Sequence, residues 1–250
     1  MLWMLTLLGG LTVAQADEAD DVVARLKAWK AHRKADSVPS IPTSIYREAL
    51  GGDIAKGIEF VEEVKAAKGY AVAVFDIPIA QLWRAVTDKD HHANQLPVQI
   101  SRTVEGQPRT HDHTIFQYLE VPLFTDRWWL VNITYNAALY TASEGKAWEL
   151  VWRDRNQDAA LKAKLDPETL EDGMPVAWTK GAWLLVDIGK GRTLIEYHTW
   201  SDPGGSVPVG PATRLAAREV VSTLEGIARF AQTHTPTCKG RYTRPDGSAQ

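Results

Sequence analysis

The chain lacks the residue patterns that mark the common enzyme classes and nucleic-acid binders. Its 250 residues include one cysteine, Cys238, so no internal disulfide can form. The net charge is only −3 and no basic block is present, which argues against nucleic acid as a partner. Nucleophile-elbow, phosphate-loop and dinucleotide motifs are missing. The pairs His91/His92 and His111/His113 have neither a cysteine partner nor i,i+4 spacing, so we predict no metal site and no cofactor.

Long apolar runs are also scarce, and the one at residues 2–13 is too short to span a bilayer. Ala14, Gln15 and Ala16 follow it and put small residues at the two positions that a signal peptidase reads. We therefore predict a signal peptide at residues 1–16, cleavage before Asp17, and a mature protein that is periplasmic or secreted. A buried N-terminal helix is the alternative interpretation of the same run.

The rest of the chain has the composition of an ordinary globular protein. Hydrophobic residues make up 44% and charged residues 24%, so the mature chain can bury a sizeable core. Its length favours one domain of moderate size, and we expect a monomer. Ten tryptophans supply unusually many large apolar faces, each with an N–H that needs a partner.

Hydrophobic periodicity separates helical from extended segments. Helical spacing and helix-ending signals predict helices at residues 17–34, 59–68 and about 211–234, and a Pro/Ser-rich break at 37–42. Strand signals separated by short turns predict mostly antiparallel strands at 70–76, 98–105, 111–121, 127–140, 147–153, 178–188 and 193–200. Residues 154–173 fit either a short helix or an extended loop.

The run at residues 202–208, Asp-Pro-Gly-Gly-Ser-Val-Pro, joins the last predicted strand to the last predicted helix. Pro203 fixes its own φ, and the two glycines admit positive φ. Pro211 suits the first turn of a helix, where its missing N–H costs nothing. The pattern predicts a sharp strand-to-helix turn followed by a helix with one apolar face.

Three segments resemble the steroidogenic-acute-regulatory-related lipid-transfer (START) domains of the helix-grip superfamily, and they stand in the expected order. The first is the junction at residues 202–208 with the helix that follows. The second is the run at 121–129, a proline-containing loop followed by Arg127 and an aromatic strand, with Trp128 in place of the usual acidic residue. The third is the run at 73–88, a strand, a proline-started helix and a closing Thr-Asp.

The resemblance implies an α+β helix-grip (START-like) fold, in which a curved antiparallel sheet wraps around a long C-terminal helix and encloses an internal hydrophobic cavity. It divides the mature chain into an N-terminal helical segment at 17–52, a START-like lipid-binding domain at 53–234 and a C-terminal tail at 235–250. It also implies a lipid or other hydrophobic small molecule as ligand, transient contact with a membrane, and a gate at Gly204, Gly205 and Pro208.

Alternation along the predicted strands indicates which side chains face the cavity. On one strand, the more apolar face carries Arg127, Trp129, Val131, Ile133 and Tyr135. On another, Trp148, Leu150 and Trp152 share a face. We predict that these residues contact the ligand, although ordinary core packing is the alternative for each tryptophan.

A guanidinium at the edge of an apolar cavity needs an anionic or carbonyl partner, because it cannot shed its charge. We predict that Arg127 pairs with Asp112 or a ligand head group, since START domains place an acidic residue and an arginine in the pocket. His113 is the alternative partner, and a solvated hairpin corner is the alternative site. Glu196 and His198 share a strand face and are either solvated or an acid–base pair.

Two classes of function fit these patterns. The preferred one is a non-catalytic carrier that binds a hydrophobic ligand in the cavity and transfers or presents it. The alternative is an aromatase/cyclase-type enzyme on a polyketide-like substrate, in which Arg127, His113 or the pair Glu196 and His198 would do acid–base chemistry. The predicted signal peptide favours the carrier, since such enzymes act beside cytoplasmic synthases.

Overall fold

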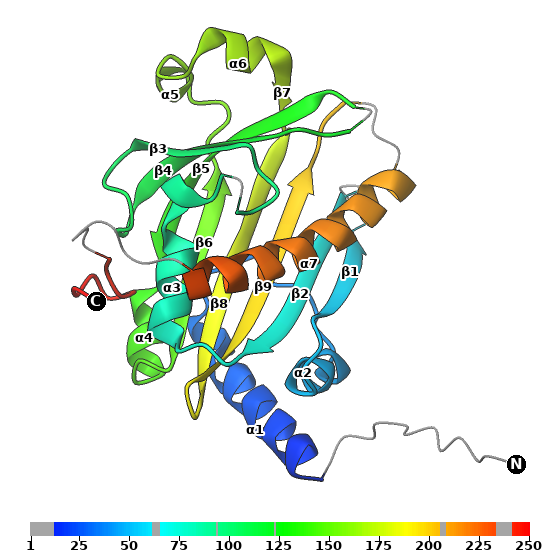
Figure 1. Cartoon of the computed structure of the whole chain (residues 1–250), viewed down its shortest axis with the longest axis vertical. Helices are drawn as coiled ribbons and strands as arrows, with labels where there is room; N and C mark the ends of the chain where they lie inside the picture. The colour runs from blue at the N-terminus through cyan, green and yellow to red at the C-terminus, as the bar shows by residue number, and fades with distance from the viewer. Residues whose placement is uncertain (1–12, 62–65, 94, 123, 206–208, 234–241) are drawn as a thin grey trace, which may run out of the picture.

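The computed structural model describes residues 13–61, 66–93, 95–122, 124–205, 209–233 and 242–250 (Figure 1). Its helices are α1 (Val13–Trp29), η1 (Lys30–His32), α2 (Thr43–Leu50), α3 (Ile79–Thr87), η3 (Lys89–His91), α4 (Ala137–Ala142), α5 (Ala159–Lys162), α6 (Pro167–Asp172) and α7 (Val209–Thr233). Its strands are β1 (Ala55–Val61), β2 (Ala66–Phe75), β3 (Ile100–Glu105), β4 (His113–Leu119), β5 (Asp126–Tyr135), β6 (Ala147–Asp154), β7 (Gly173–Pro175), β8 (Trp178–Gly189) and β9 (Arg192–Asp202).

One sheet of nine strands forms the body of the molecule. Eight strands follow in the order β1-β2-β9-β8-β6-β5-β4-β3, with antiparallel neighbours throughout, and β7 pairs in parallel with the start of β5. Between β2, which is next to the edge strand β1, and β3, at the opposite edge, the chain crosses the sheet through α3 and η3. These two helices therefore cover one end of the sheet.

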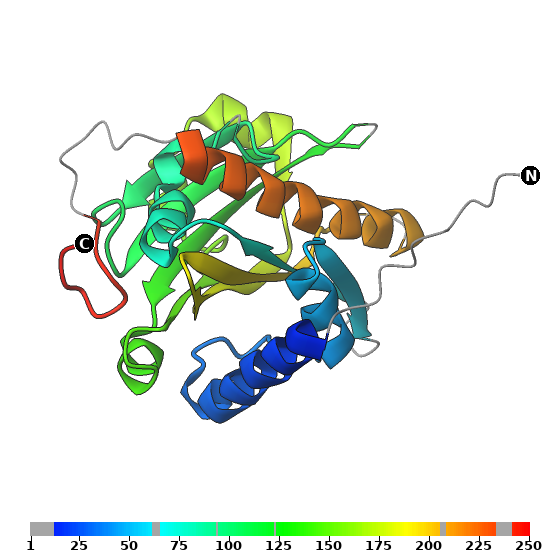
Figure 2. The same ribbon diagram turned by 60° about the horizontal axis from the view of Figure 1, so that its bottom comes forward.

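The two faces of the sheet are covered by different parts of the chain. Helix α7 crosses one face, with α3 beside its C-terminal end (Figure 1). Figure 2 shows α1 and α2 on the opposite side of the sheet from α7. The α+β fold, the antiparallel sheet and its long C-terminal helix are confirmed.

Strand alternation builds a separate core on each face. On β8, Trp183 and Leu185 pack in the cluster that includes α3 and α7, whereas Leu184 and Val186 pack in the cluster under α1, α2 and α4. A third cluster lies under α5 and α6, around residues of β4 and β5. Alternate residues of a strand therefore face opposite sides of the sheet, one set toward α7 and the other toward the N-terminal helices.

The N-terminal segment is fastened to the outer face of the sheet by a buried ionic network. The Arg33 side chain pairs with Glu149 and, at 3.0 Å, with Glu196. The Tyr46 hydroxyl donates to Glu196 at 3.0 Å, and the Asn136 side-chain amide donates to Glu149 at 2.6 Å. Burial alone would lower the pKa of Arg33, but the two carboxylates raise it above its usual value.

The described part of the C-terminal tail packs against α3. Trp83 Nε1 donates to the Thr243 carbonyl at 2.8 Å, and Gln250 donates to the Ala80 carbonyl at 2.6 Å. The buried Tyr242 hydroxyl donates to the Asp88 carboxylate at 2.8 Å. The tail thus holds the segment that closes one end of the sheet.

The predicted helix at residues 59–68 is wrong. The described residues of this range lie in β1 and β2, with Glu59 opposite Lys68 in the register. Their side chains form a cross-strand ion pair at 3.0 Å, and Glu59 also accepts from the Ser40 backbone N–H at 2.7 Å. The charges that suggested a solvated helix are therefore an edge-strand pair.

The predicted strand at residues 127–140 is too long. The strand ends at Tyr135, because the Asn136 side chain accepts from the Leu139 N–H at 3.0 Å and starts α4. The other predicted strands coincide with β2, β3, β4, β6, β8 and β9 within a few residues. Residues 154–173 contain α5 and α6, and α2 was not predicted.

The predicted cleavage point lies inside α1, in which Ala19, Val22 and Val23 are buried. Cleavage before Asp17 would keep these buried contacts, and export stays a prediction. In the parts of the chain that the structure describes, none of the helices combines the length and apolar character needed to cross a membrane. Pro208 and Cys238 lie outside the described residues.

Candidate functional site

A cavity of about 670 Å³ lies between α7 and the face of the sheet that this helix crosses. Its wall is mostly apolar and includes, from five strands and α7, the side chains of Ile115, Val131, Trp152, Trp183, Tyr197 and Val220. Tyr197 stacks on Trp152 with 5.8 Å between ring centroids, and Gly181, opposite Trp152 in the register, leaves room for its ring. The wall is suited to an apolar ligand surface.

One of the two faces predicted for β5 lies at the cavity. Arg127, Trp129, Val131 and Ile133 line it. Trp129 Nε1 donates to Gln117 on β4 at 3.0 Å, so the indole is held across the strand pair. These positions remain predicted ligand contacts, and the structure supplies their location.

Three predicted contacts lie beyond the cavity wall. Tyr135, Trp148 and Leu150 pack in the core against α3 instead. The Trp83 ring of α3 makes edge contacts with Tyr135 at 4.9 Å and with Trp148 at 5.5 Å. The α3 crossover fills this end of the sheet, so the cavity stops before these residues. Trp152, on the same face of β6, does line it.

Arg127 is not paired with Asp112. Its guanidinium donates to the Pro203 carbonyl at 2.6 Å, to the Gly204 carbonyl at 3.3 Å, and to the carbonyls of Thr125 and Asp126. All three nitrogens of the guanidinium therefore donate to backbone carbonyls. The residue clamps the end of β9 to the start of β5.

Asp112 lies just before β4, with a positive φ of 63°. Its exposed carboxylate accepts from the Asn132 side chain at 2.9 Å on the outer side of the sheet. The predicted pairing with Arg127 failed because Asp112 belongs to a turn and not to the strand face. His113 is also not the partner, since its Nδ1 contacts the Thr110 carbonyl at 2.7 Å.

The predicted gate is described at its two glycines. Gly204 and Gly205 both have φ of +68°, which a side chain would strain. A Cβ on Gly205 would meet Met174 Sδ at 3.4 Å and Arg127 Nη2 at 3.6 Å. Both glycines line the cavity, and their role as a gate stays a prediction.

Glu196 and His198 point away from the cavity. Both are buried on the outer face of the sheet, under the N-terminal segment, where His198 Nε2 contacts the Ser37 hydroxyl at 3.2 Å. Burial lowers the pKa of His198 to about 3. Their neighbours in β9, Tyr197 and Thr199, are the residues that line the cavity. The pair cannot act on a ligand bound under α7.

Four charged residues of the cavity wall were not predicted, namely Lys89, Asp202, Arg218 and Glu219. Lys89, in η3, is 6% exposed, and burial lowers its pKa to about 7. Glu219, on α7, also lines the cavity, and burial raises its pKa to about 7. Lys89 stands between two aspartates in the sequence, so local composition indicates a solvated turn. The burial of Lys89 is evident only from the tertiary structure.

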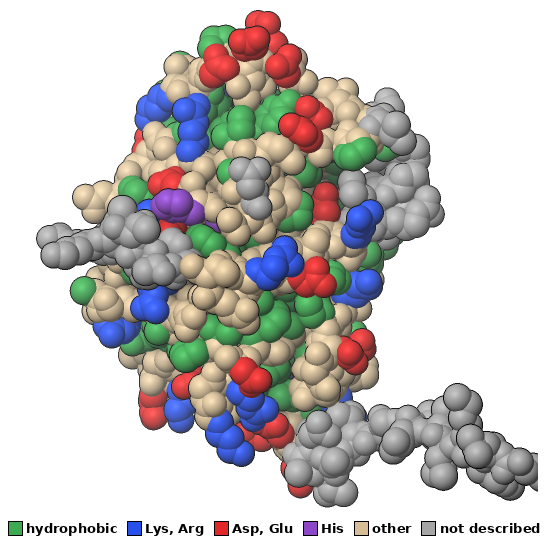
Figure 3. Space-filling view, viewed as in Figure 1, with side chains coloured by type: hydrophobic (Ala, Val, Ile, Leu, Met, Phe, Trp, Pro, Cys, Tyr) green, Lys and Arg blue, Asp and Glu red, His purple; other side chains and the backbone are tan. Residues whose placement is uncertain are grey.

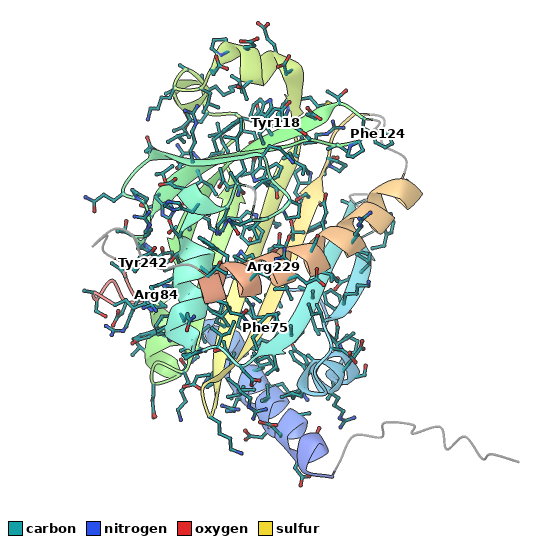
Figure 4. The ribbon with its side chains drawn as sticks, in the orientation of Figure 1. Phe75, Arg84, Tyr118, Phe124, Arg229 and Tyr242 are labelled. Carbon is teal, nitrogen blue, oxygen red and sulfur yellow. The ribbon has the colours of Figure 1, made fainter. Side chains whose placement is uncertain are left out.

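The cavity meets solvent at the end where α7 begins. Phe60 and Phe124 line it and are 43% and 44% exposed. Figure 4 places Phe124 at this end of the sheet, whereas Arg84 and Tyr242 lie at the other end, near the C-terminus of α7. Figure 3 shows further hydrophobic side chains at the surface on both sides of α7. The mouth is therefore partly apolar.

No protein-family model matches the sequence, and no curated protein matches it either. Several solved structures, however, are similar to this chain. A STAR-related lipid transfer protein fragment from Xanthomonas axonopodis is 16% identical, with a TM-score of 0.60 over 72% of this chain and 94% of that chain. Human STARD10 is 11% identical, with a TM-score of 0.55 over 81% of this chain and 83% of its own.

A third similar structure is the human StAR-related lipid transfer protein 5. It is 7% identical, with a TM-score of 0.55 over 89% of this chain and 98% of its own. At these identities the similarity concerns the fold alone. The order of the strands, the crossover through α3 and the long helix across the sheet give this chain the START-like, helix-grip fold.

Proposed function

We propose that the protein binds one molecule of a lipid or another hydrophobic compound in the cavity under α7, and transfers or presents it unchanged. The observation that carries the proposal is the cavity of about 670 Å³ with its largely apolar wall. Ligand pockets typically measure about 300–1,000 Å³. Removing apolar ligand surface from water contributes roughly 25 cal/mol per Å², so such a wall favours an apolar molecule.

The distribution of polar groups supports an amphipathic ligand. Arg127 and Ile133 lie six residues apart on β5, which separates the ends of the wall by about 20 Å. Lys89, Asp202, Arg218 and Glu219 are further charged residues in a mostly apolar lining. The similar structures from Xanthomonas axonopodis and human are named for lipid transfer. We propose entry at the mouth near Phe124, during transient contact with a membrane.

Extraction of the native ligand tests the proposal directly. The full chain is purified from its own host without detergent, and native mass spectrometry is recorded before and after organic extraction. We expect a bound hydrophobic molecule at a ratio near one per chain, because the cavity of about 670 Å³ has room for one such molecule. A protein that is always empty, and that takes up neither a fluorescent acyl probe nor a fluorescent sterol, would contradict the proposal.

Adjacent tryptophans on β5 provide a matched pair of variants. Trp129 lines the cavity, whereas Trp128 is buried on the opposite face among Phe116 and Leu130. Trp129→Ala should weaken binding of the fluorescent acyl probe by about 1–3 kcal/mol, with little change in circular dichroism. Trp128→Ala should lower stability and leave the affinity of the folded fraction unchanged. The reverse pattern would remove Trp129 from the binding wall.

The enzyme alternative is tested by the same material. Host lipids are incubated with the protein and their masses are compared before and after. A carrier returns its ligand unchanged. A reproducible change of mass that requires the folded protein would favour the aromatase/cyclase hypothesis instead. With Glu196 and His198 on the outer face, that hypothesis must rely on other groups.

A further inference from the structure

Lys89 is a buried residue, and none of the described residues forms an ion pair with its amine. It lines the cavity on the side of α3 and is 6% exposed. Its Nζ lies 5.7 Å from the centroid of the Trp183 ring, and no described residue accepts a hydrogen bond from it. A contact with an aromatic ring replaces only part of the interactions that an ammonium group has with water. A charged Lys89 would therefore gain from a further, anionic partner.

The acidic neighbours of Lys89 in the sequence are engaged elsewhere. Asp88 accepts from Arg109 Nε at 2.7 Å. Asp90 accepts from the Thr103 hydroxyl at 2.9 Å. Accordingly, burial is the cause of the low pKa of Lys89, with no carboxylate opposing it. Neither aspartate neutralises the amine.

The histidines near Lys89 are held neutral. His92 contacts the Ala85 carbonyl through Nε2 at 2.8 Å, and His113 contacts the Thr110 carbonyl through Nδ1 at 2.7 Å. Burial lowers the pKa of His92 to about 3 and that of His113 to about 4. Lys89 is therefore the group at this end of the wall that can carry a positive charge near neutral pH.

The wall contains two other cations. Arg127 donates to the backbone carbonyls of Thr125, Asp126, Pro203 and Gly204. Arg218 on α7 is exposed, so water already solvates its charge. Glu219 on α7 is an acid, so it offers an anion no positive charge, and once ionised it would repel one. Among the described residues of the wall, Lys89 is therefore the cation that offers a negatively charged group the most favourable buried location.

We propose that Lys89 anchors the head group of the ligand, and that the ligand class is a single-chain amphiphile with a carboxylate at one end. The inference rests on the proposed binding function. The carboxylate pairs with the Lys89 amine at the α3 end, and the apolar chain runs along the β5 wall toward the mouth. Pairing in a dry cavity is stronger than the same ion pair at the surface.

Calorimetric titration of the delipidated full chain with laurate and with 1-dodecanol tests the assignment. The two probes have chains of equal length and differ in the charge of the head group. Near pH 6.5 the wild type should bind laurate about tenfold or more tightly than dodecanol. Lys89→Met should abolish this preference and leave dodecanol binding within about threefold. Glu219→Gln, a polar change on the same wall, should keep it.

The preference should depend on pH. With a pKa of about 7, the Lys89 amine of the empty protein is charged below neutral pH and loses its proton above it. Laurate affinity relative to dodecanol should therefore fall as the pH rises from 6.5 to 8.5. Glu219 gains charge over the same range, so the titration is repeated in Glu219→Gln, where the fall should persist.

The outcomes separate the two hypotheses. Equal binding of both probes to the wild type, unaltered by Lys89→Met, overturns the anchor and leaves the carrier intact. Failure of both probes to bind contradicts the proposed function as well. Lys89→Met removes an uncompensated buried charge, so it should fold. If it does not fold, the same two titrations of Lys89→Gln and the pH profile of the wild type show whether the preference for laurate depends on the Lys89 charge.

Discussion

At the scale of single residues, Arg127 shows how a correct position can come with an unexpected role. It lines the cavity as predicted, but its guanidinium holds the carbonyls of Pro203 and Gly204 at 2.6 and 3.3 Å. These carbonyls lie in the turn that leads from β9 to α7. The residue therefore connects the cavity wall to the predicted gate.

Arg127→Met should loosen this turn. It leaves several backbone carbonyls without their donor, which costs about 1–3 kcal/mol of stability, and it should speed both uptake and release of a fluorescent acyl probe in stopped-flow measurements. Arg127→Lys keeps the charge but loses the planar fork, so its effect should be intermediate. Unchanged exchange rates together with a changed set of co-purifying lipids would instead make Arg127 a head-group contact.

At the scale of elements, the placement of α7 depends on a close approach at Gly226. A Cβ on this glycine would overlap the Gln95 carbonyl and lie 2.8 Å from Leu96 Cδ2. Gln95 and Leu96 belong to the segment between η3 and β3, and Leu96 lines the cavity. The helix is therefore seated directly against the segment that closes the α3 end.

Gly226→Ala should destabilise the protein although alanine favours a helix. Its propensity gain is about 1 kcal/mol, whereas forcing a methyl group into a packed contact costs about 1–3 kcal/mol. Urea unfolding should show a net loss. Glu225→Ala, at the exposed neighbouring position of the same helix, should change the midpoint little. A Gly226→Ala variant more stable than the wild type would show that α7 can move away from the segment.

At the scale of the whole molecule, the N-terminal helices are joined to the sheet by buried charge and not by apolar contacts alone. The Arg33 side chain is 10% exposed, and the carboxylates of Glu149 and Glu196 are 0% and 1% exposed. Removing one partner from such a network leaves uncompensated buried charge. The N-terminal segment and the START-like domain should therefore unfold together.

Arg33→Met should lower the free energy of unfolding by about 3–5 kcal/mol, measured by urea titration of the full chain. Arg153→Met is the matched control, because Arg153 pairs with Asp36 of the same segment at 3.2 Å but both side chains are at least half exposed. That pair should contribute at most about 1 kcal/mol. Equal losses from the two variants would show that burial of the Arg33 network adds nothing.

The resemblance of three segments to START domains implied the class of fold. Residue patterns by themselves determined two local features, the alternation along β5 and the strand-to-helix turn before α7. These features depend on local geometry: period-two and period-3.6 patterns, and glycines that accept positive φ. Trp129, Val131 and Ile133 could therefore be assigned to one face without knowledge of the neighbouring strands.

Only the tertiary structure decided where the cavity ends and which charges belong to it. The α3 crossover fills the end near Tyr135, and a turn 76 residues away supplies the carbonyl partner of Arg127. The sequence around Lys89 is that of an exposed turn, yet packing under the sheet buries it in the wall. Partners and burial arise from contacts between distant segments, which no local period records.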